Sequence, residues 1–106
     1  MDSFNQLTPA EAERLALMLE ELGEAQQAIG KILRHGYEEY SPFDESKTTN
    51  REALARELGH VIAALTLMAV NGDVSEETIN LSSVHKSINV GRWLHHNEPV
   101  AQAKSN

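Results

Sequence analysis

The chain of 106 residues contains no cysteine. This absence excludes disulfide bonds and thiolate metal sites, so the fold must rest on packing, aided by metal binding or by oligomerisation. Aromatic residues make up only 5% of the sequence, and charged residues 24%. Alanine, leucine and glutamate are frequent instead, which favours helices over a β-sandwich. We therefore expect an all-α protein.

Positive charge is also scarce: 9 lysines and arginines face 16 aspartates and glutamates, for a formal net charge of -7. Broad binding to duplex nucleic acid needs clustered basic residues, so we expect none, whereas small phosphorylated ligands are not excluded. Residues 1–6 lack the basic and apolar segments of a secretory signal. No segment approaches the roughly 20 apolar residues of a membrane span. We expect a cytoplasmic protein without a membrane partner.

The length indicates one domain over residues 1–106, an antiparallel bundle of three to four helices with a thin core. A first helix is predicted from Thr8-Pro9-Ala10-Glu11, where Thr8 and Glu11 form a capping box around Pro9. It should end at His35-Gly36. Its core stripe recurs at steps of 3 and 4 and consists of Leu15, Met18, Leu22, Ala25, Ile29 and Ile32.

A long loop is expected over residues 37–49, which have no sustained period and contain a proline. Its aromatics Tyr37, Tyr40 and Phe43 either anchor the loop on the bundle or stack against a flat ligand. Thr49 or Asn50 then caps a second helix ending at Asn71-Gly72, with the stripe Leu54, Leu58, Val61, Leu65 and Met68. Ser75 caps a third helix, and residues 97–106 are expected to be a frayed tail.

Two short strings on the predicted helix pair nearly repeat each other: Glu21-Leu22-Gly23-Glu24 and Glu57-Leu58-Gly59-His60. Ionisable groups at i and i+3 lie on one helix face, so each string offers two metal ligands. If the helices pack together, these groups converge where uncompensated charge is costly, and a bound cation is the natural compensation. The alternative is a solvated acidic helix face.

A glycine lies inside each string, and glycine within a helix costs about 1 kcal/mol relative to alanine. Missing side chains at Gly23 and Gly59 would let the two helices approach closely and bring ligands from both to one cation. A tight crossing without any metal is the other interpretation.

Three glutamates, Glu21, Glu24 and Glu57, supply the hard oxygens that Mg²⁺ and Mn²⁺ prefer. Such a site suits phosphate chemistry, because a metal ion can neutralise developing charge and activate a water. Glu20 points about 100° away from Glu21 around the helix and could take a proton from that water.

At these residues, over roughly positions 8 to 95, the chain resembles MazG-like proteins of the all-α nucleoside triphosphate pyrophosphatase superfamily, of the kind common in bacteria and phages. The family pattern is Glu-Glu-x-x-Glu on one helix and Glu-x-x-Asp on the next. Glu20, Glu21 and Glu24 meet the first half, and Glu57 with the run 61–65 meets part of the second.

The resemblance implies a homodimer or homotetramer that cleaves a nucleotide substrate between its α- and β-phosphates with Mg²⁺, releasing a monophosphate and pyrophosphate. By the same resemblance, Glu21, Glu24 and Glu57 correspond to metal ligands, and Glu20 corresponds to the residue that activates water. His60 stands where the family has aspartate. An imidazole removes a negative charge and shifts metal preference from Mg²⁺ toward Mn²⁺ or Zn²⁺.

Basic and amide side chains further along the helices could bind phosphates, with ordinary surface charge as the alternative. They are Lys31, Arg34, Lys86, Asn89 and Arg92. Three other functions stay open: a catalytically impaired relative that binds nucleotides or a partner, a di-iron carboxylate protein, and a structural helical adaptor. The di-iron alternative follows from Glu57-x-x-His60, but that architecture needs a second such motif.

Overall fold

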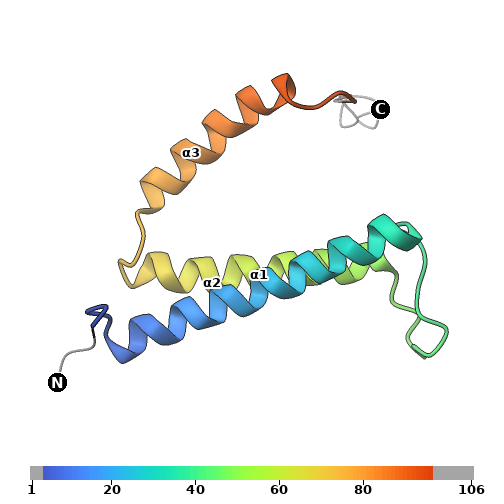
Figure 1. Cartoon of the computed structure of the whole chain (residues 1–106), viewed down its shortest axis with the longest axis horizontal. Helices are drawn as coiled ribbons and strands as arrows, with labels where there is room; N and C mark the ends of the chain where they lie inside the picture. Colours follow the sequence, from blue (N-terminus) through green and yellow to red (C-terminus); the bar gives the residue numbers. More distant parts are fainter. Residues whose placement is uncertain (1–3, 97–106) are drawn as a thin grey trace. The chain divides into compact units, whose positions relative to one another are not determined.

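The computed structural model describes residues 4–96, where the regular secondary structure is helical and no strand occurs. Its elements are α1 (Pro9–His35), α2 (Asn50–Val70), α3 (Glu76–Asn89) and a short 3₁₀ helix, η1 (Val90–Arg92), as Figure 1 shows. The all-α prediction is confirmed. The described residues up to 73 and those from 74 onward form two compact units, so a single domain over 1–106 stays a prediction. The expected frayed tail lies outside the described residues.

The ends of the helices follow the capping signals in the sequence. Thr8 and Glu11 form the predicted capping box, with Pro9 in the first turn of α1. Thr49 caps α2 and Ser75 caps α3 through their side-chain oxygens. Beyond the C-terminal ends of α1 and α2, Gly36 and Gly72 have φ of 89° and 77°, a conformation that glycine adopts without strain. The predicted bounds of α1 and α2 and the predicted start of α3 are therefore confirmed to within a residue.

In the first unit, α1 and α2 pack side by side as an antiparallel pair (Figure 1). The buried core between them is small and consists of Ala25, Ala28, Ala64 and Met68. Ala64 is the most enclosed of these, at 1% exposed. Alanines on both helices allow the backbones to approach closely, which brings the side chains flanking the core within contact distance.

The predicted core stripe of α1 is wrong in part. Leu15, Leu22 and Ile29 are each 43% exposed, because a two-helix pair covers only one side of each helix. Leu58 in the predicted stripe of α2 is similarly exposed. The apolar residues of each helix therefore cover a wider arc than the pair can bury.

The glycines within the two helices do not create the close crossing expected from the sequence. A Cβ atom added at Gly23 or Gly59 would have no other described part of the protein within 4 Å, apart from the nearby backbone of its own helix. The interpretation that these glycines bring α1 and α2 together is therefore wrong for the contact within one chain. Their helix-propensity cost of about 1 kcal/mol each has no packing reason inside this unit.

Both ends of the helix pair are tied. At one end, Arg14 of α1 donates two hydrogen bonds to the Asp73 carboxylate, at 2.5 and 2.9 Å, and this contact lowers the pKa of Asp73. At the other end, backbone carbonyl groups of the loop over residues 36–49 accept hydrogen bonds from the first turn of α2. The backbone N–H groups of Asn50 and Arg51 donate to the carbonyls of Glu39 and Tyr37, each at 2.8 Å.

The aromatic residues of the loop differ in their surroundings. The guanidinium of Arg51 lies 4.2 Å from the centre of the Tyr37 ring and also donates to Glu38 at 2.6 Å. Tyr37 therefore anchors the loop on the helix pair, whereas Phe43 projects into solvent. Further along, Asp44 accepts from the backbone N–H groups of Ser46 and Thr48 and from the Ser46 hydroxyl, and these bonds lower the pKa of Asp44.

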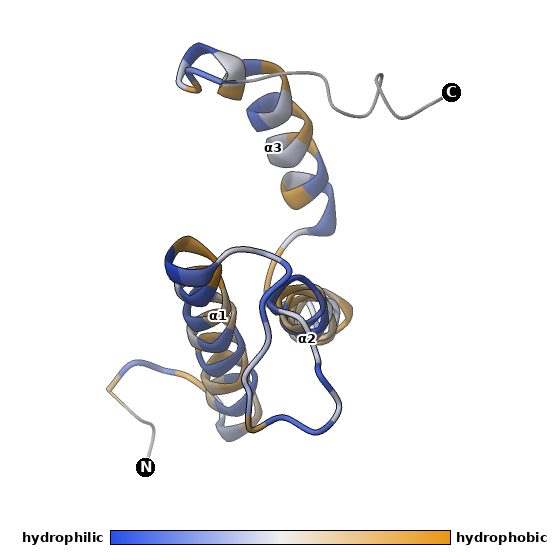
Figure 2. Ribbon diagram, turned by 90° about the vertical axis from the view of Figure 1, so that its right-hand side faces the viewer, coloured by the Kyte–Doolittle hydropathy of each residue, from blue (hydrophilic) through white to orange (hydrophobic). Residues whose placement is uncertain are grey.

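α2 is the most apolar helix of the described chain. By length and composition alone it could cross a membrane, with a mean hydropathy of 1.5 over its most apolar window. This corrects the expectation that no segment comes near such a span, although a core helix of a bundle passes the same test. Only 11% of that window is buried within the chain. Figure 2 shows apolar residues on the side of α2 that faces away from α1.

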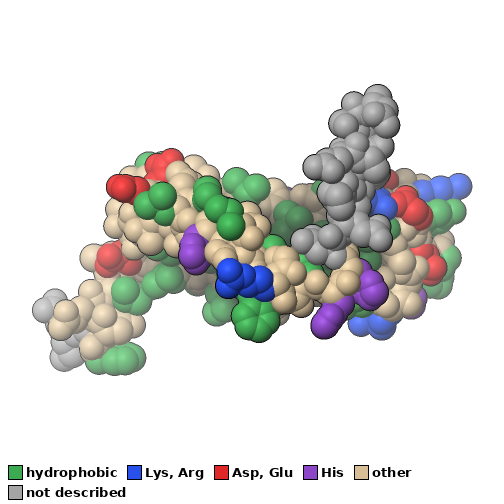
Figure 3. Space-filling model, turned by 90° about the horizontal axis from the view of Figure 1, so that it is seen from above, with side chains coloured by type: hydrophobic (Ala, Val, Ile, Leu, Met, Phe, Trp, Pro, Cys, Tyr) green, Lys and Arg blue, Asp and Glu red, His purple; other side chains and the backbone are tan. Residues whose placement is uncertain are grey.

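The second unit contains α3 and η1. Its large apolar side chains are open to solvent, and none of its described residues is buried. They are Leu81, Val84, Ile88, Trp93 and Leu94. The space-filling view shows hydrophobic, basic and histidine side chains on the molecular surface (Figure 3). α3 therefore carries apolar residues that it does not bury by itself.

Candidate metal centre

The two near-repeated strings meet across the α1–α2 contact. One donor atom from each of Glu21, Glu24, Glu57 and His60 lies within 4.8 Å of the other three. Two ligands come from each helix, because the pair at i and i+3 on α1 faces the pair at i and i+3 on the antiparallel α2. The structure thus brings these four sequence-predicted residues together.

Two of the carboxylate oxygens at this centre are buried without a hydrogen-bond partner, namely Oε2 of Glu21 and Oε2 of Glu57. Their side chains are only 14% and 15% exposed. The Nδ1 atom of His60 approaches both oxygens, at 3.5 and 3.4 Å, which is long for a hydrogen bond. Buried carboxylate oxygens without partners are costly, so this centre is electrostatically incomplete.

Crowding of negative charge changes the acidity of the third carboxylate. A hydrogen bond with Glu57, together with the negative charge of Glu21, raises the pKa of Glu24. The charge of Glu20 adds to the effect. A raised pKa means that the folded protein without a cation resists having all of these carboxylates ionised at once.

A divalent cation fits this arrangement. Three carboxylates and one imidazole are ligands of the kinds that Mg²⁺ and Mn²⁺ accept, and two of the carboxylate oxygens have no hydrogen-bond partner. His60 is 50% exposed, so one side of the centre is open. An open side leaves the centre accessible to water, a feature that catalytic metal sites share.

Glu20 lies outside this group of four. Its side chain is exposed on α1, about 100° around the helix from Glu21. The structure therefore does not bring Glu20 into the cluster. Its role as a base stays a prediction.

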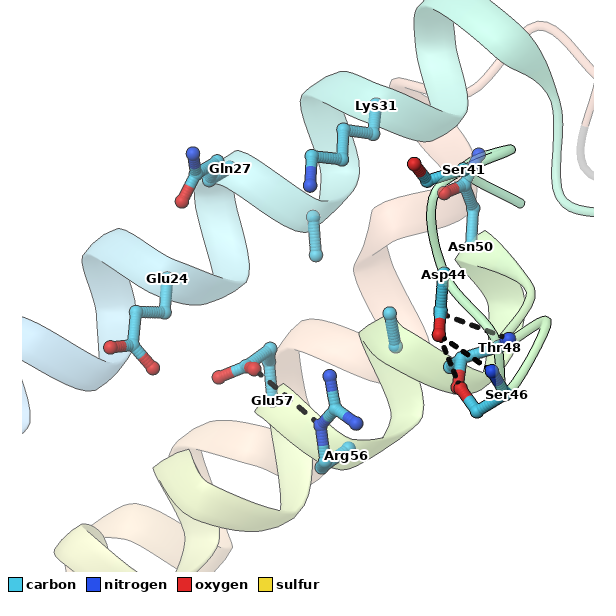
Figure 4. Close-up of a pocket in the computed structure, with 12 residues that line it drawn as sticks. Glu24, Gln27, Lys31, Ser41, Asp44, Ser46, Thr48, Asn50, Arg56 and Glu57 are labelled. Carbon is cyan, nitrogen blue, oxygen red and sulfur yellow. Dashed lines mark hydrogen bonds and ion pairs between the residues drawn. The ribbon is translucent and has the colours of Figure 1, made fainter. Parts of the chain in front are cut away.

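A polar cavity of about 530 Å³ adjoins the centre, between the two helices and the loop over residues 36–49 (Figure 4). Glu24 and Glu57 form one part of its wall, so the centre opens into it. Lys31, predicted to bind phosphate, also lines this cavity. The other lining residues are Gln27, Ala28, Ser41, Asp44, Ser46, Thr48, Asn50, Ala53 and Arg56.

Sequence reasoning missed the most prominent cation of this cavity. Arg56 precedes Glu57 on α2, and its Nε lies 3.8 Å from Oε1 of Glu57. Figure 4 shows its guanidinium directed into the cavity. Adjacency to a predicted metal ligand was the available signal, but neighbouring helix positions diverge by about 100° and so do not normally share a site.

The remaining predicted phosphate-binding residues are not gathered at the centre. Arg34 lines a second cavity of about 390 Å³, which also includes Lys31, His35 and Tyr40. Lys86, Asn89 and Arg92 belong to the second unit. The side-chain amide of Asn89 donates to the carbonyl of His85 at 2.8 Å. Substrate binding by these residues stays a prediction.

Comparison with models of protein families, with curated proteins and with solved structures finds no match to this chain. The resemblance to MazG-like proteins therefore rests on the two half-motifs and on nothing wider. The chemistry of the four converging side chains has to carry the functional argument.

Proposed function

We propose that this chain hydrolyses a nucleoside triphosphate to the monophosphate and pyrophosphate with the help of Mg²⁺ or Mn²⁺. The observation that carries the proposal is the convergence of Glu21, Glu24, Glu57 and His60 within 4.8 Å, with two carboxylate oxygens left without partners. The resemblance to MazG-like proteins supplies the reaction. Glu21, Glu24 and Glu57, with His60 as the fourth ligand, would hold the ion.

The divalent cation, when bound, would neutralise charge on the phosphate oxygens and polarise the attacking water. Glu20 accepts a proton from that water as its oxygen bonds to the α-phosphorus. The bond between the α-phosphorus and the oxygen that bridges to the β-phosphorus breaks. That oxygen leaves with pyrophosphate, and the water oxygen stays on the monophosphate, so no other reactant is consumed.

The direct test measures pyrophosphate release. Each common ribonucleoside and deoxyribonucleoside triphosphate is incubated with the full chain and Mg²⁺ or Mn²⁺, and the products are separated. We expect monophosphate and pyrophosphate from at least one nucleotide, with turnover stopped by a chelator. Release of inorganic phosphate would contradict cleavage at the α-phosphorus, and no turnover with every nucleotide and both ions would overturn the proposal.

We also propose that the chain acts as a homodimer or homotetramer. The support is an outer apolar face of the helix pair, defined by Leu15, Leu19, Leu22, Ile29 and Leu33 of α1 with Leu58 and Ile62 of α2. Leu19 and Leu33 are 73% and 83% exposed. These positions follow one another at helical spacing on one side of each helix, so a second copy of the chain can cover them as a unit.

A charge placed on this outer apolar face should dissociate the oligomer. Burying an isoleucine side chain contributes about 1.5–3 kcal/mol to the free energy of association. Ile62→Glu is therefore expected to raise the dissociation constant by about tenfold or more. Light scattering against concentration measures the change. Ala63→Glu is the matched control, because Ala63 is exposed at the next position, about 100° around α2. A monomeric unmodified chain, or equal effects of both variants, would contradict this assembly.

A further inference from the structure

The residues that line the polar cavity beside the metal centre suit the phosphate end of a nucleotide better than its base. Among the described residues, the lining contains hydroxyls, amides and charged groups, with Ala28 and Ala53 as the only apolar side chains. None of the described residues that line the cavity is aromatic, so they offer no platform on which a base could stack. Two cations, Lys31 and Arg56, reach it from opposite helices. The carboxylates of Glu24, Glu57 and Asp44 also line it, so the cavity fits an anion that comes with a divalent cation at the two glutamates, rather than a flat heterocycle.

Lys31 is placed to meet a ligand that is held at the centre. It lies seven residues after Glu24, two turns further along the same face of α1. Side chains of an α-helix lean toward its N-terminus, so the Lys31 amine leans back toward Glu24. Figure 4 shows this amine extending from α1 into the cavity. A group bound between the two helices would lie within its reach.

Arg56 approaches the same space from α2. Its contact with Glu57, 3.8 Å between Nε and Oε1, is too long for a hydrogen bond and leaves the guanidinium donors available. Guanidinium groups bind phosphate oxygens through two parallel hydrogen bonds, which a lysine cannot do. Arg56 thus stands beside a metal ligand with its donors directed into the cavity.

The wall opposite the helices is held in a fixed shape by the loop itself. Both oxygens of Asp44 are occupied, Oδ1 by the N–H and hydroxyl of Ser46 and Oδ2 by the N–H of Thr48. Asp44 is therefore engaged with its own loop, and its charge is offset by several donors. The hydroxyl of Thr48 lies 2.7 Å from that of Ser46, so the polar wall is organised before any ligand arrives.

We propose that this cavity holds the β- and γ-phosphates of the substrate, and afterwards pyrophosphate, with Lys31 and Arg56 as the anion-binding residues. This inference rests on the proposed function and fixes the direction of the nucleotide: the triphosphate tail points under the loop, and the nucleoside lies outside the cavity. It follows that Arg56 contributes to affinity for every nucleotide and does not discriminate among bases.

Pyrophosphate binding is the probe that tests this inference. Titration calorimetry with the full chain at saturating Mg²⁺ should show that Arg56→Gln and Lys31→Gln each weaken pyrophosphate binding by about tenfold or more. Affinity for Mg²⁺ alone, measured separately, should change little. Lys47→Gln is the matched control: Lys47 is an exposed cation of the same loop, between Ser46 and Thr48, and does not line the cavity.

The outcomes separate this inference from the proposed function. Unchanged pyrophosphate affinity in both variants, or an equal loss in Lys47→Gln, overturns the anion site even if hydrolysis proceeds. A parallel loss of Mg²⁺ affinity in Arg56→Gln also overturns it, because Arg56 would then act through Glu57. Selective loss of pyrophosphate binding in a chain that hydrolyses no nucleotide supports the anion site and refutes the pyrophosphohydrolase. A change of base preference in Arg56→Gln contradicts the assigned direction.

Discussion

Glu24→Gln is expected to stabilise the metal-free protein while it lowers affinity for Mg²⁺ or Mn²⁺ by about 100-fold and abolishes hydrolysis. A hydrogen bond with Glu57 and the negative charge of Glu21 raise the pKa of Glu24, and a neutral amide keeps the hydrogen bond while it removes the repulsion. The same substitution removes a ligand that a cation needs. Thermal unfolding with and without metal, together with titration calorimetry, measures both effects.

The pH dependence of stability provides a second readout of Glu24. Because its pKa is raised in the folded protein, the folded state binds more protons than the unfolded chain above the ordinary glutamate range. Its contribution to the stability of the metal-free protein therefore falls as pH rises through that window and recovers as pH falls. This part of the slope should vanish in Glu24→Gln, and metal affinity should rise with pH as the ion displaces the proton.

Glu20→Gln is the matched control for this prediction, because Glu20 is an exposed glutamate of the same helix and lies outside the group of four. It should keep metal affinity and lose hydrolysis, as expected for a base that does not bind the ion. If Glu24→Gln destabilised the metal-free chain and retained full metal affinity, the centre would be a structural feature and no metal site.

His60→Asp is expected to raise the hydrolysis rate with Mg²⁺ by about tenfold and to shift ion preference from Mn²⁺ toward Mg²⁺. A carboxylate restores the hard oxygen at the position where the imidazole now lies 3.4–3.5 Å from Oε2 of Glu57 and Glu21. Values of kcat/KM with each ion measure the change. His60→Asn is the control, because it removes the imidazole without adding a charge.

The opposite result would be equally informative about His60. If His60→Asp lost activity with both ions, the imidazole itself would serve the reaction, and the centre would differ in mechanism from MazG-like proteins. A large gain would instead identify this chain as a weakened enzyme, whose present role includes binding a nucleotide without rapid turnover. Equal activity of the unmodified chain, His60→Asp and His60→Asn would exclude His60 from the ligands.

Local signals in the sequence were sufficient to predict the helices and the convergence of Glu21, Glu24, Glu57 and His60. Capping residues such as Thr8, Thr49 and Ser75 act through hydrogen bonds within four residues, so their effect can be read without knowing the rest of the fold. The ligand pairs could be predicted because i and i+3 spacing fixes a shared face, and an antiparallel pair places two such faces opposite each other.

Other features depend on which side of each helix is covered, and no local signal reports that. Leu22 and Ala25 belong to one apolar stripe in the sequence, but in the folded pair Ala25 is buried and Leu22 is half exposed. The same limit explains why Gly23 was assigned to a contact that it does not make. Arg56 was missed because it lies about 100° around α2 from Glu57, and the cavity that both residues line is formed only when two helices and a loop come together.

Contacts at both ends of the helix pair fix the register of α1 against α2, and this register bears on how an ion could be recognised. Arg14 and Asp73 hold one end, and the loop that joins α1 to α2 holds the other. Sliding by one helical turn would shift a side chain by about 5.4 Å, more than the 4.8 Å that separates the donor atoms. Such a displacement is prevented at both ends. If the four side chains bind a cation, as proposed, the ion would meet ligands whose register is already set, and the fixed frame would favour ions of matching size.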